Sequence, residues 1–294
     1  MKTFFITLFA AIFSFQSFAQ KIPAYYSAGT KQGTINEVRG ELKAKLKENN
    51  FKVLGGYYPE GKTNNYVLVY TNSTIQMIGY SLRNFAIFSS ALRIGLISND
   101  KGVEITYLNP EYFFRGYYMS SYNTIKSKLE PIENSINKMF KAYGGELKPF
   151  GGSVSTSDLT KYHYMIGMPY FNETILLKEF DSFETAVATI EKNLNSKKGD
   201  TKLVYKLVYN KSKKAVFGVG LLNKTKGEPA FLPIIGRKNI AALPYEIAVI
   251  NNKAYMLHGR FRFAFYWPDL TMGTFTKIMS TPGDVKDMME VLTK

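Results

Sequence analysis

The chain carries the stretch ALRIGLI at residues 91–97 and a related stretch, ALPYEIA, at residues 242–248. Each stretch is followed by an Asn-containing turn, NDK at 99–101 and NNK at 251–253, and by a second apolar run. A Pro-containing segment then follows in both places, NPEYF at 109–113 and WPDL at 267–270. A repeat with so long a period predicts two copies of one domain, because the units of solenoid proteins are much shorter.

Helix and strand signals occur in the same order in both halves. A capping-box pattern opens a helix at 34–37 and another at 181–184, and apolar residues at helical spacing follow each. Alternating or continuous apolar runs indicate strands after each helix. We predict an α+β fold of two tandem β-α-β(4)-α-like repeats, with mostly antiparallel sheets and helices on one face of each. The first repeat is expected at 20–150 and the second at 151–294, with the boundary inside the Gly-rich window 144–158.

Three of these features resemble the domain-of-unknown-function family numbered 302. They are the helix entry DSFETAV at 181–187, the strand start Ala242-Leu243-Pro244, and the C-terminal succession of a strand, a proline and a helix. The resemblance covers Asp181 to Leu292 and, more loosely, Asn36 to Tyr143. It implies a fold similar to that of the TATA-box-binding protein, and it implies no reaction, because the family has no established activity. Tyr245 stands where the family commonly has Cys, which argues against a thiol-based role.

The N-terminus has the pattern of a secretory signal peptide. Lys2 precedes an apolar run from Phe4 to Phe13, and Ser17-Phe18-Ala19 is a small-x-small cleavage site. We expect cleavage after Ala19 and a mature protein in the periplasm or outside the cell; the alternative is an uncleaved anchor. The chain has no Cys, so neither disulfides nor a lipidated cysteine are available. The combination is typical of a bacterial envelope protein.

The net charge is +15. Such a charge is compatible with nucleic-acid binding, but export and the dispersal of the lysines among glutamates favour a solvated surface, with attraction to anionic ligands or polymers as the alternative. We therefore expect no nucleic-acid partner. No further apolar run in the mature chain is long enough to span a membrane, and the oligomeric state is left open.

Familiar catalytic motifs are missing from the sequence. The histidines are His163 and His258, which lack metal-ligand spacing, so we expect no metal site. Gly218 and Gly220 lack the third glycine and the helix of a nucleotide-binding loop, and close strand packing explains them better. We expect no cofactor.

The segment Leu257–Phe265 alternates apolar and polar residues, which predicts a strand continuing a hairpin of 243–250 with 254–266. One face would then carry the phenylalanines and the other His258, Arg260 and Arg262, with Glu246 opposite His258. Two interpretations stay open. The arginines bind an anionic ligand, or they are ion-paired and structural. Trp267 is either core or a stacking platform beside the same ligand.

The leading functional hypothesis is an exported, non-enzymatic binding or interaction protein with an unknown, anionic ligand. Its ligand-binding candidates are Arg260, Arg262, His258 and Trp267. The first alternative is an enzyme of unrecognised type with His258, Glu246 and Tyr245 as acid/base groups, and the second is a self-associating envelope protein. The methionines at 272, 279, 288 and 289 are either core or an adaptable binding surface.

Overall fold

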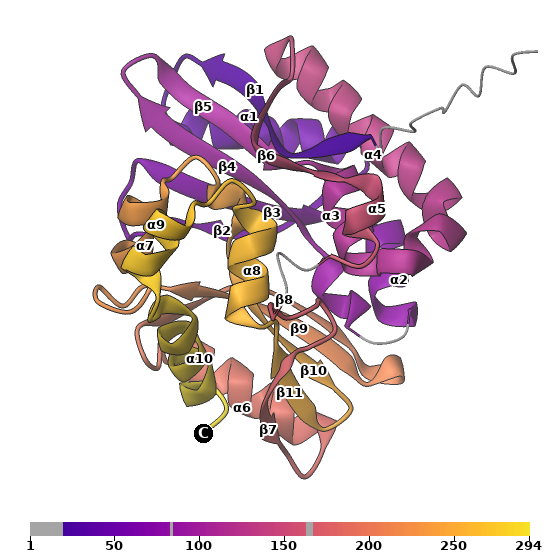
Figure 1. Cartoon of the computed structure of the whole chain (residues 1–294), viewed down its shortest axis with the longest axis vertical. Helices are drawn as coiled ribbons and strands as arrows, with labels where there is room; N and C mark the ends of the chain where they lie inside the picture. Colours follow the sequence, from indigo (N-terminus) through magenta and orange to yellow (C-terminus); the bar gives the residue numbers. More distant parts are fainter. Residues whose placement is uncertain (1–19, 83–84, 163–166) are drawn as a thin grey trace, which may run out of the picture.

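Two antiparallel sheets with helices packed against them make up the protein in its computed structural model, which describes residues 20–82, 85–162 and 167–294 (Figure 1). The predicted α+β class is confirmed. The predicted signal peptide at 1–19 and His163 lie outside the described residues. No helix in the described part of the chain has the length and apolarity needed to cross a bilayer.

The first sheet has the strand order β2-β3-β4-β5-β1-β6. The turn at 99–101 joins β4 and β5 into the expected hairpin, in which Ile94 pairs with Tyr107. The strands are β1 (Lys21–Lys31), β2 (Lys52–Tyr57), β3 (Asn65–Thr71), β4 (Leu92–Asn99), β5 (Gly102–Leu108) and β6 (Lys148–Ser155).

The second sheet has the strand order β7-β11-β10-β9-β8. If β7 to β11 are matched in chain order with β1 to β5, the two sheets have the same strand order: β8-β9-β10-β11-β7 corresponds to β2-β3-β4-β5-β1. The strands are β7 (Ile175–Glu179), β8 (Thr201–Tyr209), β9 (Lys214–Leu221), β10 (Tyr245–Ile250) and β11 (Lys253–Met256).

Helices cover the outer face of each sheet. The capping box at Thr34 and Glu37 is present and begins α1 (Ile35–Glu48), which packs on β3 and β4. On the same face, Tyr107 stacks on Phe140 of α4 (Tyr122–Gly144), with ring centroids 4.1 Å apart. In the second half α6 (Phe183–Asn195) packs on β8 and β10, and α10 (Thr281–Val291) contacts β7.

The inner faces of the two sheets pack against each other. Each half inserts a short 3₁₀ helix into the other: η1 (Ala86–Ser89) packs on β9 and β10, and η4 (Ile240–Ala242) packs on β4 and β5. Two further helices, α3 (Pro110–Tyr118) and α8 (Gly259–Tyr266), meet where Tyr112 donates a hydrogen bond of 2.8 Å to the carbonyl of Phe265. The remaining elements are α2 (Ser73–Ser81), η2 (Met119–Ser121), α5 (Thr156–Leu159), η3 (Asn210–Ser212), α7 (Glu228–Ile235), α9 (Met272–Phe275) and η5 (Thr276–Ile278).

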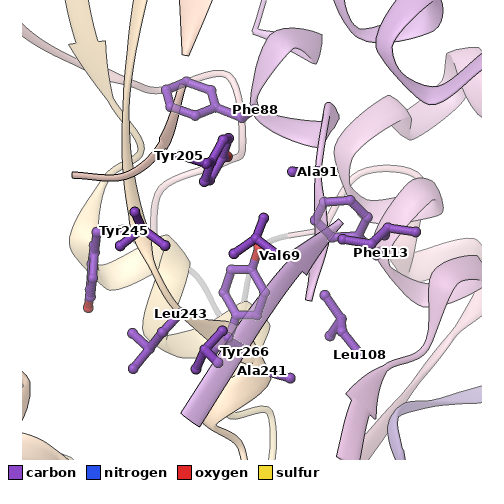
Figure 2. Close-up of a cluster of buried hydrophobic side chains, with 14 of the residues drawn as sticks. Val69, Phe88, Ala91, Leu108, Phe113, Tyr205, Ala241, Leu243, Tyr245 and Tyr266 are labelled. Atoms are coloured by element: carbon purple, nitrogen blue, oxygen red, sulfur yellow. The ribbon is translucent and has the colours of Figure 1, made fainter. Parts of the chain in front are cut away.

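Aromatic side chains from both halves fill this shared core. Figure 2 shows Val69, Phe88 and Phe113 of the first half around the same space as Tyr205 and Tyr266 of the second. The glycines on β9 serve this packing, because a Cβ at Gly220 would lie 2.6 Å from the ring of Tyr57.

Much of the window predicted as a linker, 144–158, is strand. β6 pairs with β1, so that Tyr25 lies opposite Phe150 and the first sheet extends through Ser155. The division of the chain at residue 150 stays a prediction.

The strand predicted over 254–266 is wrong beyond Met256. β11 ends there, and residues 259–266 form the helix α8, whose N-cap is His258. The observed register pairs Ile247 with Met256, so Glu246 does not lie opposite His258. Alternation failed as a signal because α8 lies between the two sheets and is buried on nearly every side, so its apolar residues need not follow one stripe.

The close approach of the two sheets gives a first prediction. A Cβ at Gly55 on β2 would lie 2.0 Å from the backbone carbonyl oxygen of Val204 on β8. Because the contact is with backbone, a side-chain rotation cannot relieve it. Gly55→Ala should lower the free energy of unfolding by about 1–3 kcal/mol, as overpacking does. Urea denaturation measures this free energy of unfolding.

Gly40→Ala is the matched control, because nothing lies within 4 Å of a Cβ at Gly40. Gly40 lies within the helix α1, so the change to alanine should stabilise the protein by about 0.5–1 kcal/mol. Equal effects of the two variants would contradict the packing described.

Candidate functional site

A buried cluster of three charges joins the two sheets. The carboxylate of Glu246 on β10 accepts from Arg262 of α8 through one oxygen and contacts Arg93 of β4 through the other. All three side chains are at most 2% exposed. An ion pair so buried is costly to form and costly to break, because the remaining charge has no access to water.

Arg262 uses both terminal nitrogens of its guanidinium inside the protein, while its Nε is buried without a hydrogen-bond partner among the described residues. Besides pairing with Glu246, it donates hydrogen bonds of 2.6 Å to the carbonyl of Ala242 and 3.2 Å to that of Pro244. Its guanidinium lies 4.2 Å from the ring centre of Tyr245 and 4.7 Å from that of Tyr266. Both terminal nitrogens are therefore engaged, and Arg262 offers none of them to a ligand.

The helix separates the two arginines that the sequence placed together. Residues two apart in a helix point about 200° away from each other, whereas in a strand they share a face. Arg262 consequently points into the core and Arg260 is exposed. Arg260 forms no ion pair with any described residue.

The charge cluster gives a second prediction. Glu246→Gln keeps the shape of the side chain but leaves two buried guanidinium groups without a counter-charge. The free energy of unfolding should fall by about 3–5 kcal/mol. Arg260→Ala, which removes an exposed charge on the same helix, should change it by less than about 0.5 kcal/mol. Chemical denaturation of both variants provides the comparison, and a mild effect of Glu246→Gln would show that the cluster does not hold the halves together.

A second buried carboxyl, Glu228 at the start of α7, also joins the halves. Its Oε1 accepts hydrogen bonds from the hydroxyl of Tyr57 (2.6 Å) and from the backbone N–H of Leu221 (3.2 Å). Oε2 has no hydrogen-bond partner among the described residues. Complete burial raises the pKa of Glu228 well above the ordinary value of a glutamate, against the smaller, opposing effect of these hydrogen bonds.

This raised pKa gives a third prediction. The folded state holds the proton of Glu228 over a pH range in which the unfolded chain has lost it, so this group lowers the stability progressively as the pH rises above the unfolded pKa. Glu228→Gln removes the titration. The free energy of unfolding of the variant minus that of the wild type should therefore increase between about pH 4 and about pH 8. A difference that is constant with pH, measured by urea denaturation, would contradict the assignment.

An apolar pocket lies on the surface of α8 and α9, and it brings together two of the predicted ligand-binding residues, Arg260 and Trp267. Its volume is about 60 Å³. Arg260 is its exposed, cationic member. The other lining residues are apolar: Met168, Phe263, Ala264, Trp267, Leu270, Met272 and Phe275.

Trp267 forms part of the wall of this pocket. It is 2% exposed, and its ring packs on Phe263 with centroids 5.6 Å apart. Its Nε1–H has no hydrogen-bond acceptor among the described residues. A buried indole usually finds an acceptor, so the unpaired Nε1–H of Trp267 is an exception in this core.

The acid/base candidates do not assemble into a catalytic site. Nδ1 of His258 accepts a hydrogen bond of 3.2 Å from the N–H of Arg260 and caps α8. Partial burial, and next the positive charge of Arg260, lower the pKa of His258. Glu246 is enclosed by guanidinium groups, and Tyr245 lies beneath Arg262. Within the described ranges, no three His, Cys, Asp or Glu side chains are placed to hold a metal ion.

Sequence reasoning missed part of this arrangement. Arg93 was not singled out, although a charge within the apolar run ALRIGLI is a signal for a buried ion pair. The pocket residues 263, 264 and 267 have helical spacing, which becomes visible only when α8 is known to be a helix. In the first half, Asn109 has the position of His258: it caps α3 directly after β5, with Oδ1 accepting from the N–H of Glu111.

Neither the protein-family models nor the curated proteins contain a match to this chain. The resemblance to the family numbered 302 therefore stays a prediction.

Proposed function

We propose that this chain is an exported, non-enzymatic binding module built by duplication of one α+β unit. The equal strand paths of the two sheets and the repeated sequence stretches support the duplication. The resemblance to family 302, which has no established activity, fits a binding role. Export rests on the pattern of residues 1–19.

The ligand-binding site we propose is the pocket on α8 and α9. It supplies an apolar cavity and one exposed guanidinium, that of Arg260. These groups together suit a ligand that carries a small apolar end and, next to it, a carboxylate or another anion.

One observation carries this proposal: Arg260 is free of ion pairs with the described residues, while Arg93 and Arg262 are paired inside the core. A guanidinium left unpaired beside an apolar pocket is available to bind an anion. Glu246 and Tyr245 are buried against guanidinium groups and cannot reach a substrate in this pocket. Binding therefore accounts for the geometry better than acid/base catalysis does.

The fourth prediction uses Trp267, the single tryptophan of the chain, as the reporter. The branched acid 4-methylpentanoate should change the fluorescence of Trp267 in a saturable manner, and its uncharged amide should bind more weakly. Arg260→Gln should weaken binding of the acid about five- to tenfold, the value of one partly exposed charge-assisted hydrogen bond.

Lys43→Gln is the control for this experiment, because it removes a cation that is exposed on α1, far from the pocket in sequence. It should leave the affinity unchanged. The proposal fails if the acid does not perturb Trp267, or if both variants weaken binding equally.

A further inference from the structure

The surface around the pocket is unusually apolar. Three of the six large apolar side chains that are markedly exposed in the described part of the chain lie here: Ile234 (42% exposed), Met272 (55%) and Met279 (63%). We call these three residues the methionine rim. Ile234 lies on α7, Met272 on α9 and Met279 directly after η5; α7 contacts both α9 and η5, and Figure 1 shows α7 beside α9. Scattered apolar residues are normal on a surface, whereas a gathered group marks an interaction site.

The volume of the pocket limits what it can enclose. Pockets that bury a whole small ligand or cofactor measure roughly 300–1,000 Å³, and this one measures about 60 Å³. Only a few heavy atoms fit inside. A small molecule bound here would leave most of its surface in water, whereas a polypeptide can insert one side chain and spread the rest over the methionine rim, as anchor residues of protein interfaces do.

The charged residues at this surface favour an acidic partner. Arg260 lies at the pocket, and Lys277 of η5 is exposed two residues after Phe275. Neither forms an ion pair with a described residue. The acidic residue of this segment, Asp269, is exposed next to β6: a Cβ at Gly152 would lie 3.3 Å from the Cβ of Asp269.

We infer that the pocket and the methionine rim form a docking site for an acidic polypeptide segment that inserts one bulky apolar side chain beside Trp267. This inference rests on the proposed function and names its partner class. Methionine suits such a surface, because its flexible, polarisable side chain adapts to different partner shapes. Arg260 and Lys277 would bind carboxylates on either side of the inserted residue.

The fifth prediction compares a peptide with the small acid on the full mature chain. The probe is a heptapeptide with a central leucine flanked by three aspartates on each side, with both ends blocked. It should bind at least about tenfold more tightly than 4-methylpentanoate, because it adds contacts with the rim. A peptide with glycine in place of leucine, and another with asparagines in place of aspartates, should each lose most of this gain.

Variants separate the rim from the pocket. The double variant Ile234→Gln, Met279→Gln changes two rim residues that do not line the pocket. This double variant and the variant Lys277→Gln should weaken peptide binding about three- to tenfold while 4-methylpentanoate, which reports on the pocket, binds as before. Met77→Gln is the matched control, because Met77 is exposed on α2 outside the rim. Thermal unfolding of each variant confirms that the fold is retained.

Each outcome decides the inference. A peptide that binds no more tightly than the small acid overturns the docking site and leaves the proposed function standing. If neither probe binds, both proposals fail. If vesicles of phosphatidylglycerol bind the protein, the rim double variant abolishes this binding, and the peptide does not bind, the rim is a membrane contact and the inference is wrong.

Discussion

Glu246 places one carboxylate between two buried guanidinium groups, and the arrangement of the molecule depends on this contact. Arg93 comes from the first sheet, Glu246 from the second, and Arg262 from the helix that lies between them. Removing the charge of Glu246 leaves both guanidinium groups without a counter-charge in a region from which water is excluded. The aromatic core around the cluster stabilises the same interface without fixing it, because apolar contacts tolerate small shifts and a hydrogen-bonded ion pair does not. The cluster thus fixes the register in which the two inner faces meet.

The position of α8 gives its two arginines different environments. The helix α8 carries Arg-Phe-Arg and turns the first arginine to solvent and the second to the core, so a single segment supplies both a structural cation and the cation of the proposed binding site. His258 begins this helix by accepting from the N–H of Arg260, and this cap holds Arg260 at the edge of the pocket. The proposed binding surface therefore lies on the helix that joins the two halves, which would give that surface a rigid support.

The sequence predicted the α+β class, the two hairpin turns and the capping box at 34–37, because these follow from local chemistry: an Asn-containing turn, a Thr cap, an apolar stripe. The capping box expected at 181–184 is wrong: α6 has a simple N-cap, in which Ser182 accepts a hydrogen bond from the N–H of Thr185. The sequence did not predict α8. The alternation of Arg and Phe is a strand signal only when one face meets water, and tertiary burial on nearly all sides removes that condition. It also missed Arg93 as the second partner of Glu246, since the long-range pairing of Arg93 with a residue of the other half leaves no local pattern. Because α8 was not predicted, the pocket was predicted only in part: Arg260 and Trp267 were named, while Leu270, Met272 and Phe275 were not associated with them.

The most direct test of this division of roles is the NMR signal of the arginine Nε–H groups in ¹⁵N-labelled protein. Buried, paired guanidinium groups exchange their protons slowly, whereas exposed ones exchange rapidly with water. We expect slowly exchanging signals for Arg93 and Arg262 that do not respond to 4-methylpentanoate, and a signal of Arg260 that becomes protected when the acid is added. Rapid exchange at Arg262, or a ligand response at Arg262 instead of Arg260, would contradict this expectation.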